Sequence, residues 1–362
     1  MSRANRDVGG YRGRRTITDI LTFIAVTLAV IVILVLAGLF FAQRYIVYTD
    51  DGPKLELPPF LQMFRREEAG PGTSASLPDP GSVSVVIEPD SSQTEPQPEQ
   101  SAGCALELTV DDVVNGTAAA KLEEGDAQAL ILDVKEASGQ LAWYSDLFTA
   151  DWAEVNAPRT NNDALKEWNA GEVYTIARVC CFRDDSVPYS MNKLALRKGS
   201  YNWRDELGLR WLSPAQEEAQ AYIAGLCAEL AYLGFDEIVL EQFFFPVQGN
   251  VDNINQGDSY NPARFTAELE EFLTQVQAAV EPYGTKLSLR VDEDVLTSEG
   301  LALSGVTPQL LEQYACRIWT THDGLYALSI PPHEGYEQER MVEIVAQAVQ
   351  DSEIFQAVIP RQ

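Results

Sequence analysis

The sequence predicts an α/β domain of the (β/α)8-barrel type, closed or incomplete, that follows one transmembrane helix and a disordered stalk. Strand and helix patterns alternate from Cys104 onward, as in folds built from βα units. This stretch is close to the about 250 residues of a typical eightfold barrel. A near-continuous apolar run, Ile238–Phe245, lies between Gly234 and Pro246, and such a run is typical of a parallel strand buried on both faces.

Eight segments have the composition and flanking residues of strands. The sixth and seventh predicted strands are nearly contiguous, and there is little helical pattern between the fifth and the sixth. An incomplete barrel is therefore the alternative to a closed one. The predicted strands are Leu106–Val110, Ala129–Lys135, Val173–Cys181, Glu237–Phe244, Lys286–Val291, Cys316–Thr320, Leu325–Ile330 and Phe355–Ile359.

Helical spacing of apolar residues is clearest in Pro214–Leu233. Ser213 is the expected N-cap, and Gln216 completes a capping box with it. Two further helices are predicted over Arg264–Val280 and Glu337–Val349.

A basic tail followed by an uncharged run predicts a membrane anchor at the N-terminus. Ile20–Ala42 carries no charge and is long enough to cross a bilayer, which takes about 20 residues. It exceeds the about 7–15 residues of a signal-peptide core. The preceding arginines outnumber Arg44 on the other flank, so the N-terminus is expected in the cytoplasm and the C-terminal domain outside the cell. These arginines are Arg3, Arg6, Arg12, Arg14 and Arg15. A buried globular helix is the alternative.

The remaining boundaries follow from composition. Residues 1–16 form the basic cytoplasmic tail, 17–43 the transmembrane helix, 44–103 the stalk and 104–362 the barrel. The stalk is rich in Pro, Ser, Glu and Gln, a composition that cannot bury enough apolar surface to fold. Two apolar patches interrupt it: Leu55–Phe64, a candidate interfacial contact, and Val83–Ile87, a candidate extra strand.

Charge restricts the partners. The chain has 26 basic against 54 acidic residues. Nucleic acid is not expected as a partner, because phosphate binding needs a basic face. Neutral or cationic partners are favoured over anionic polymers.

Cysteines and histidines are few. The five cysteines leave at least one unpaired, and neighbouring Cys180 and Cys181 point to opposite faces of a strand. The chain contains no CxxC motif and only two histidines, so no structural metal is expected. No phosphate-binding or dinucleotide-binding loop occurs, and we expect no cofactor.

Three segments resemble one known family. They are Leu130–Ser145 (LILDVKEASGQLAWYS), Tyr174–Asp185 (YTIARVCCFRDD) and Leu233–Pro246 (LGFDEIVLEQFFFP). Their pattern is similar to that of bacterial, membrane-anchored, α-amylase-like (β/α)8 barrels classed as glycoside hydrolases. The positions that match are Asp133, Lys135, Gly139, Tyr144, Ser145, Ala177, Arg178, Phe182, Asp184, Gly234, Phe235, Asp236, Glu237, Ile238, Phe245 and Pro246.

The chain departs from the family pattern at polar positions, as a divergent member would. Glu241 stands where the family has Asp, Gln242 where it has Tyr, and Phe244 where it has Arg. The resemblance implies a barrel that acts on glycans, and these departures leave open whether the chain has kept catalysis.

Charged residues within the apolar strands are the candidate site. Asp133 and Lys135 lie two apart on a strand and are expected to share a face. Arg178 interrupts another strand, and a buried guanidinium needs a carboxylate partner, Asp133 or Glu241. These residues form either a polar site at the barrel mouth, with Lys135 and Arg178 binding substrate, or an inert ion-pair layer.

Glycoside hydrolysis needs two carboxyl groups, one protonated and one ionised. Glu241 is the expected acid, because apolar neighbours such as Phe243 would raise its pKa. Asp292 or Asp133 is the expected partner. The alternative for Asp292 is a solvated acidic loop.

Aromatic residues near the strand ends are candidates for stacking on sugar rings, or else ordinary core. The candidates are Trp143, Tyr144, Trp203, Trp211 and Trp319. His322, after the sixth predicted strand, is a candidate for binding or for moving a proton.

Together these features predict a membrane-anchored, extracytoplasmic glycoside hydrolase-like protein that acts on cell-envelope or extracellular glycan by carboxylate acid/base chemistry. The alternative is a catalytically inactive barrel that binds glycan or a cell-envelope protein partner, since a barrel fold alone does not fix a function.

Overall fold

A computed structural model describes residues 46–49, 52–55, 103–329, 337–350 and 352–360. The chain divides into two compact units, Met1–Ser91 and Ser92–Gln362, which we describe separately.

The first unit contains an antiparallel hairpin of β1 (Ile46–Thr49) and β2 (Gly52–Leu55). Both strands fall in the stretch expected to be a disordered stalk, so that expectation is wrong there. The β-branched and aromatic run of β1 and the glycine that begins β2 are the composition of a hairpin. Ile20–Ala42, Val83–Ile87 and nearly all of Leu55–Phe64 lie outside the described residues. Within the described part of the chain, no helix is long and apolar enough to cross a membrane.

The second unit is a closed barrel of eight parallel strands, which resolves the choice between a closed and an incomplete barrel. Around the barrel the order is β10-β11-β12-β3-β4-β5-β8-β9, so each strand neighbours the next barrel strand in sequence. The strands are β3 (Cys104–Leu108), β4 (Ala129–Lys135), β5 (Tyr174–Cys180), β8 (Glu237–Glu241), β9 (Lys286–Arg290), β10 (Ile318–Thr320), β11 (Met341–Val345) and β12 (Phe355–Val358).

The seventh strand was predicted in the wrong place. Leu325–Ile330 overlaps helix α12 (His322–Leu328), which Thr321 caps by accepting from the Gly324 backbone N–H. The strand is β11, inside the segment predicted as a helix over Glu337–Val349. Its sequence, MVEIV, is too short to distinguish the apolar spacing of a helix from that of a strand.

Two other strand ends shift for local reasons. β3 ends at Leu108 because Thr109 forms a capping box with Asp112 and starts a helix. β8 ends at Glu241 because Gln242 adopts a left-handed backbone conformation (φ 48°).

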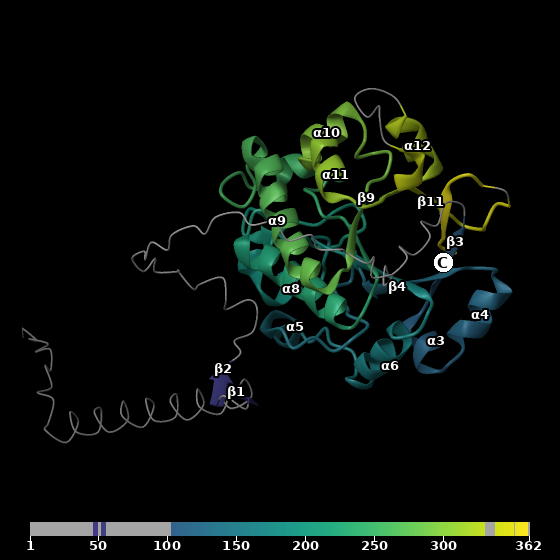
Figure 1. Ribbon diagram of the computed structural model, residues 1–362. Helices are drawn as coiled ribbons and strands as arrows, with labels where there is room; N and C mark the ends of the chain where they lie inside the picture. Colours follow the sequence, from purple (N-terminus) through teal and green to yellow (C-terminus); the bar gives the residue numbers. More distant parts are fainter. Residues whose placement is uncertain (1–45, 50–51, 56–102, 330–336, 351, 361–362) are drawn as a thin grey trace, which may run out of the picture. The chain divides into compact units, whose positions relative to one another are not determined.

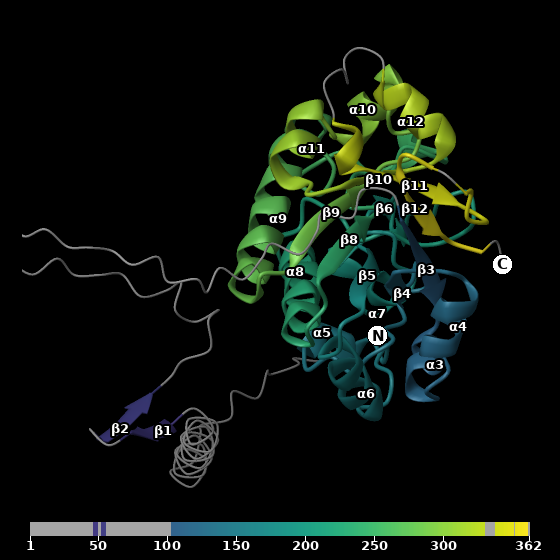
Figure 2. The ribbon, with the colours of Figure 1, turned by 45° about the vertical axis from the view of Figure 1, so that its right-hand side comes forward.

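Helices surround the barrel (Figures 1 and 2). Those after β3 and β4 are α3 (Val110–Val114), α4 (Ala118–Glu124), α5 (Phe148–Trp152) and α6 (Thr160–Asn169). Those after β5 and β8 are α7 (Val187–Ser190), α8 (Glu217–Tyr232) and α9 (Phe265–Val280), followed by α10 (Ser298–Ser304), α11 (Pro308–Tyr314) and α12. Short strands β6 (Arg197–Lys198) and β7 (Tyr201–Asn202) form a separate pair. Single 3-10 turns lie at Asn192–Leu194, Val251–Asn253, Pro262–Arg264, Glu281–Tyr283 and Gln338–Arg340.

Helix α8 begins later than predicted. Its N-cap is Gln216, with no capping hydrogen bond from a side chain, so the capping box at Ser213 is wrong. Ser213 Oγ instead donates to the Ser259 carbonyl, 2.6 Å away. Helices α8 and α9 pack side by side on one flank of the barrel (Figure 1).

Alternation along the strands gives the barrel two apolar clusters. One fills the space between strands and helices. The other lies inside the barrel and includes Ala105, Ile131, Ile176 and Val239. Because residues two apart share a face, the interior side chains of each strand form layers along the barrel axis. This apolar interior separates two charged clusters, one near each end.

Candidate active site

Six charged side chains form a cluster at the end of the barrel where the strands finish, and we name it the upper cluster. Five of them lie near the carboxyl ends of five consecutive strands, and the sixth follows the last of these strands. Its members are Glu107 on β3, Asp133 on β4, Arg178 on β5, Glu241 on β8, Arg290 on β9 and Asp292 just beyond β9. In parallel barrels this end carries the functional residues.

Glu241 is the centre of the upper cluster. Arg178 donates two hydrogen bonds to it, from Nε to Oε1 at 2.8 Å and from Nη2 to Oε2 at 3.0 Å. Arg290 donates from Nη1 to Oε1 at 2.9 Å. Of the two predicted partners of Arg178, Asp133 and Glu241, it is Glu241 that binds it, in the bidentate form that an arginine makes with a carboxylate.

Two further carboxylates share these arginines. Arg178 Nη1 also binds Glu107. Arg290 binds Asp292 through Nε–Oδ1 (3.1 Å) and Nη2–Oδ2 (3.0 Å). Since Glu241 and Asp292 bind one guanidinium, their carboxyl groups lie closer than about 10 Å, within reach of the separations that glycoside hydrolysis uses.

The pKa of Glu241 differs from the prediction. Burial alone would raise it, but Arg178 and Arg290 outweigh burial and lower the pKa to about 2. The expectation of a raised pKa is therefore wrong. The apolar neighbours are present, since Phe243 and Phe244 are buried, but two cations oppose them.

Asp133 behaves in the opposite way. Its side chain reaches solvent at the mouth, yet the surrounding protein removes enough water to raise its pKa to about 6. Arg178 lowers this pKa, while the negative charges of Glu241 and Glu107 raise it. Among the described residues, none hydrogen-bonds to the Asp133 carboxylate. Burial likewise raises the pKa of Glu107 and of Asp292.

The lower cluster lies near the other end of the barrel. Its centre is Glu237, fully buried at the start of β8. Arg317 binds both Glu237 oxygens, Nε at 3.2 Å. Tyr174 Oη (3.0 Å) and Trp319 Nε1 (3.2 Å) also donate to it. Burial would raise the pKa of Glu237, but Arg317 outweighs burial and lowers it.

A family model described as "Putative glycosyl hydrolase domain" matches residues 110–304, more than half of the chain. The chain belongs to this glycosyl hydrolase-domain family. No curated protein matches the sequence.

Three solved structures are among those similar to this chain. A hypothetical protein from Ruminiclostridium thermocellum is 22% identical, with 51% of this chain and 96% of that chain covered and a TM-score of 0.42. The PgaB (BpsB) glycoside hydrolase domain from Bordetella bronchiseptica is 11% identical, with coverage of 70% and 93% and a TM-score of 0.48. An α-galactosidase from Lactobacillus brevis is 10% identical, with coverage of 72% and 37% and a TM-score of 0.47.

Lys135, one of the residues that match the glycosyl hydrolase-domain family, does not bind at the mouth. A register shift between Asp133 and Lys135 breaks the strand's alternation, so the two do not share a face. Lys135 is fully buried, pairs with Asp184 at 2.8 Å and donates to the Cys180 carbonyl at 2.8 Å. Its prediction as a substrate-binding residue is wrong, because its charge holds β4 against the segment after β5.

Gly139 and Asp184 also hold together the segments that follow β4 and β5. Gly139 has a φ of 91°, and a Cβ there would lie 2.5 Å from Asp184 Oδ1. The same oxygen accepts the backbone N–H groups of Ser186 (3.0 Å) and Val187 (2.8 Å). These family positions therefore shape the loops after β4 and β5 without contributing a group to the mouth.

The predicted tryptophans are core residues. Trp143 and Trp319 are fully buried, and Trp203 and Trp211 nearly so. Trp143 donates to Glu229 at 3.1 Å, Trp203 to the Asn250 carbonyl at 3.0 Å, and Trp319 belongs to the lower cluster. Stacking of sugar rings on them is excluded by burial.

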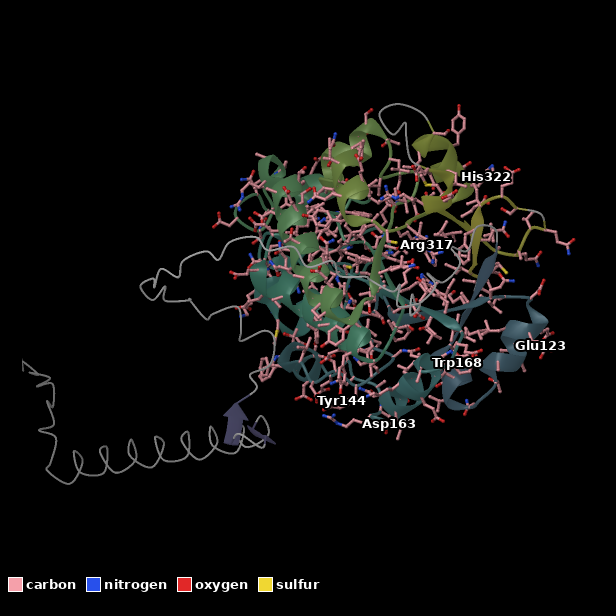
Figure 3. The ribbon with its side chains drawn as sticks, in the orientation of Figure 1. Glu123, Tyr144, Asp163, Trp168, Arg317 and His322 are labelled. Atoms are coloured by element: carbon pink, nitrogen blue, oxygen red, sulfur yellow. The ribbon has the colours of Figure 1, made fainter. Side chains whose placement is uncertain are left out.

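Tyr144 and His322 lie far apart, near opposite edges of the domain (Figure 3). The Arg159 guanidinium lies 3.7 Å from the centre of the Tyr144 ring. His322, on α12, is mostly exposed and contacts Glu343 at 2.8 Å. Arg178 is 8% exposed and directs its donors to Glu241 and Glu107, which leaves little of it for substrate.

Glu107 and Arg290 were missed from the sequence. Each is a charge within or at the end of an apolar strand, which is the signal that identified Arg178. Cys180, Cys181 and Cys227 are buried, and all five cysteines are free. In the described ranges, no group of three or more His, Cys, Asp or Glu side chains is arranged to hold a metal ion.

Proposed function

We propose that this protein is a glycoside hydrolase in which Asp133 donates the proton and Glu241 stays ionised. The observation that carries the proposal is the contrast between these two carboxyl groups, which interact at the functional end of one barrel. Asp133 has a pKa of about 6 and Glu241 a pKa of about 2. Two carboxyl groups whose pKa values are pushed apart are the pattern of an acid/base pair.

Each member of the upper cluster has a role in this mechanism. Asp133, exposed and without a hydrogen-bond partner among the residues that the structure describes, protonates the leaving-group oxygen. The negative charge of Glu241 stabilises the oxocarbenium-like transition state. Arg178 and Arg290 fix Glu241 and keep it ionised. Asp292 is the more exposed of the two carboxylates on Arg290 and is the group that attacks the sugar or activates water.

The test is substitution of the proton donor. Asp133→Asn removes the titrating proton and keeps the shape, so turnover of oligosaccharide substrates should fall by about 10²–10⁴-fold. Asp111→Asn, on the exposed side of α3, is the matched control and should leave turnover unchanged. Aryl glycosides with good leaving groups need less proton donation, so they should lose less activity. Equal turnover by Asp133→Asn and the parent protein would contradict the role of Asp133.

A glycan-binding barrel without catalysis is the second candidate. One observation favours it: both oxygens of Glu241 and both oxygens of Asp292 accept hydrogen bonds from arginines, which makes both carboxylates poorer nucleophiles and bases. Glycan binding with no hydrolysis by the parent protein would decide for this candidate.

We further propose that the protein is anchored in the cell membrane, with the barrel outside the cell, and acts on cell-envelope or extracellular glycan. The arginine-flanked uncharged run Ile20–Ala42 and the acidic composition of the chain support this location. Protease added to intact cells should remove the barrel and spare the N-terminal tail. Protection of the barrel would contradict the orientation.

A further inference from the structure

An open hollow lies outside the barrel interior, between the segments that follow β4 and β5. Its volume is about 680 Å³. The lining comes from the end of α5 and the two residues after it, from α7 and the residues before it, and from Arg210. Helices α5 and α7 contact one another (Figure 2). Both segments leave the carboxyl ends of their strands, so the hollow belongs to the same end of the barrel as the upper cluster.

Two exposed aromatic side chains line this hollow. Trp152 is 58% exposed and Tyr189 is 69% exposed. The Arg210 guanidinium lies 4.7 Å from the centre of the Tyr189 ring, so it supports the tyrosine from one side. Trp152 packs against the exposed Phe148, with 5.7 Å between ring centres. Exposed aromatic side chains that gather at one hollow, unlike single exposed ones, are typical of a ligand-binding surface.

The polar groups of the hollow are nearly balanced in charge. Arg210 pairs with Asp185 at 2.7 Å, and Arg204 reaches the same carboxylate oxygen at 3.4 Å. Glu154, Ser186 and Ser190 add a carboxylate and two hydroxyl groups. Among the described residues, none hydrogen-bonds to the Glu154 carboxylate. The hollow thus combines flat apolar faces with donors and acceptors and has no strong net charge.

We propose that this hollow binds an uncharged pyranose oligosaccharide, as a glycan-binding site separate from the upper cluster. The apolar C–H face of a pyranose ring stacks on Trp152 and Tyr189, and its hydroxyl groups bond to Glu154, Asp185 and Ser190. A polyanion is disfavoured by the excess of acidic residues in the chain. The proposal shares with the proposed function only that the protein handles glycan; it does not require Asp133 to donate a proton.

Tryptophan fluorescence of the full-length chain gives a direct test, in a detergent without a sugar headgroup. Of the six tryptophans, Trp152 is the exposed one, whereas the other five are buried or half-buried. The probes are hexasaccharides of β-1,4-linked glucose, N-acetylglucosamine and mannose, added to Asp133→Asn protein, in which hydrolysis should be slower by about 10²-fold or more. At least one should protect the protein from acrylamide quenching. Absence of protection by all three at millimolar concentration would overturn the proposal.

Variants then locate the binding. By calorimetry, Trp152→Ala and Tyr189→Ala should each weaken binding of that hexasaccharide by about tenfold or more, the effect of removing an aromatic anchor. Trp152→Phe should retain most of the affinity, which shows that the folded surface is intact. Tyr326→Ala, at a 71% exposed tyrosine on α12, is the matched control. Unchanged affinity in both alanine variants would overturn the site.

The two proposals fail differently. If only the hydrolase proposal is wrong, the parent protein binds a hexasaccharide through Trp152 and hydrolyses none. If only the binding site is wrong, the parent protein hydrolyses glycan, while the Trp152 and Tyr189 variants bind as the parent does.

Discussion

The two charged clusters inside the barrel are built from the same residue types but have different properties. The lower cluster has one carboxylate and one guanidinium, Glu237 and Arg317, and every oxygen of Glu237 has a donor. The upper cluster has four carboxyl groups around two guanidinium groups and opens to solvent at Asp133. A buried acid–arginine pair therefore does not by itself indicate catalysis. The excess of acid distinguishes the upper cluster, as does one carboxyl group that has no hydrogen-bond partner in the described part of the chain.

The largest expected effect is in the lower cluster. Arg317→Met leaves the fully buried Glu237 without its cation, and should reduce the free energy of unfolding by about 3–5 kcal/mol, as when a buried pair is broken. Urea denaturation measures this change. The double variant Arg317→Met with Glu237→Gln should recover part of the loss, because no charge is then left unpaired. A loss of less than about 0.5 kcal/mol, typical of surface sites, would show that the lower cluster contributes little to stability.

The lowered pKa of Glu241 makes the stability of the protein depend on pH. Its pKa is about 2 in the folded protein, below the about 4.3 of an unfolded chain. The folded state thus binds this proton less tightly, and the resulting stability is present above about pH 4.3 and lost as pH falls toward 2. The expected contribution is about 3 kcal/mol, which Glu241→Gln should remove. If the free energies of unfolding of parent and variant change in parallel between pH 2 and 5, then Arg178 and Arg290 do not lower the pKa of Glu241 as described.

Arg178→Met should have a smaller effect than Arg317→Met. Arg290 still binds Glu241 at 2.9 Å, so this carboxylate keeps one cation, and the Glu107 carboxylate that loses Arg178 is partly exposed to solvent. The expected loss is about 2 kcal/mol, typical of hydrogen bonds to a charged group. Urea denaturation of both variants compares the clusters directly. A larger loss for Arg178→Met than for Arg317→Met would reverse the comparison.

Sequence reasoning succeeded where a buried charge interrupts an apolar strand. A carboxylate partner for Arg178, either Asp133 or Glu241, followed from the cost of an unpaired buried charge and from the adjacency of consecutive barrel strands, and the structure shows Glu241. The barrel class and most strands followed from apolar runs of strand length. The sequence of β11 fits two periods equally well, so it was assigned to a helix.

The remaining site could not be predicted because it depends on geometry that the sequence pattern does not show. A register shift in β4 between Asp133 and Lys135 places the two side chains on different faces of the strand. The pKa of Glu241 depends on Arg290, which lies on the next strand, 49 positions along the chain. Trp152 and Tyr189 lie on α5 and α7, helices too short to show a periodic pattern, so these aromatic residues could not be assigned to the surface from the sequence.

The smallest expected stability effect concerns Asp133, and it has the opposite sign to that of Glu241. Its pKa of about 6 in the folded protein exceeds the about 3.9 of an unfolded chain. The folded state therefore binds this proton more tightly, and that contribution is full below about pH 4 and is lost as pH rises through 6. Solvent screening at this exposed side chain keeps the effect small. Asp133→Asn should match the parent in urea midpoint at pH 4 and exceed it at pH 8. A variant that gains no stability relative to the parent between these pH values would mean that the ionised Asp133 is not destabilised by its neighbours. The contrast between Asp133 and Glu241 would then disappear, and with it the reason to assign the proton donor to Asp133.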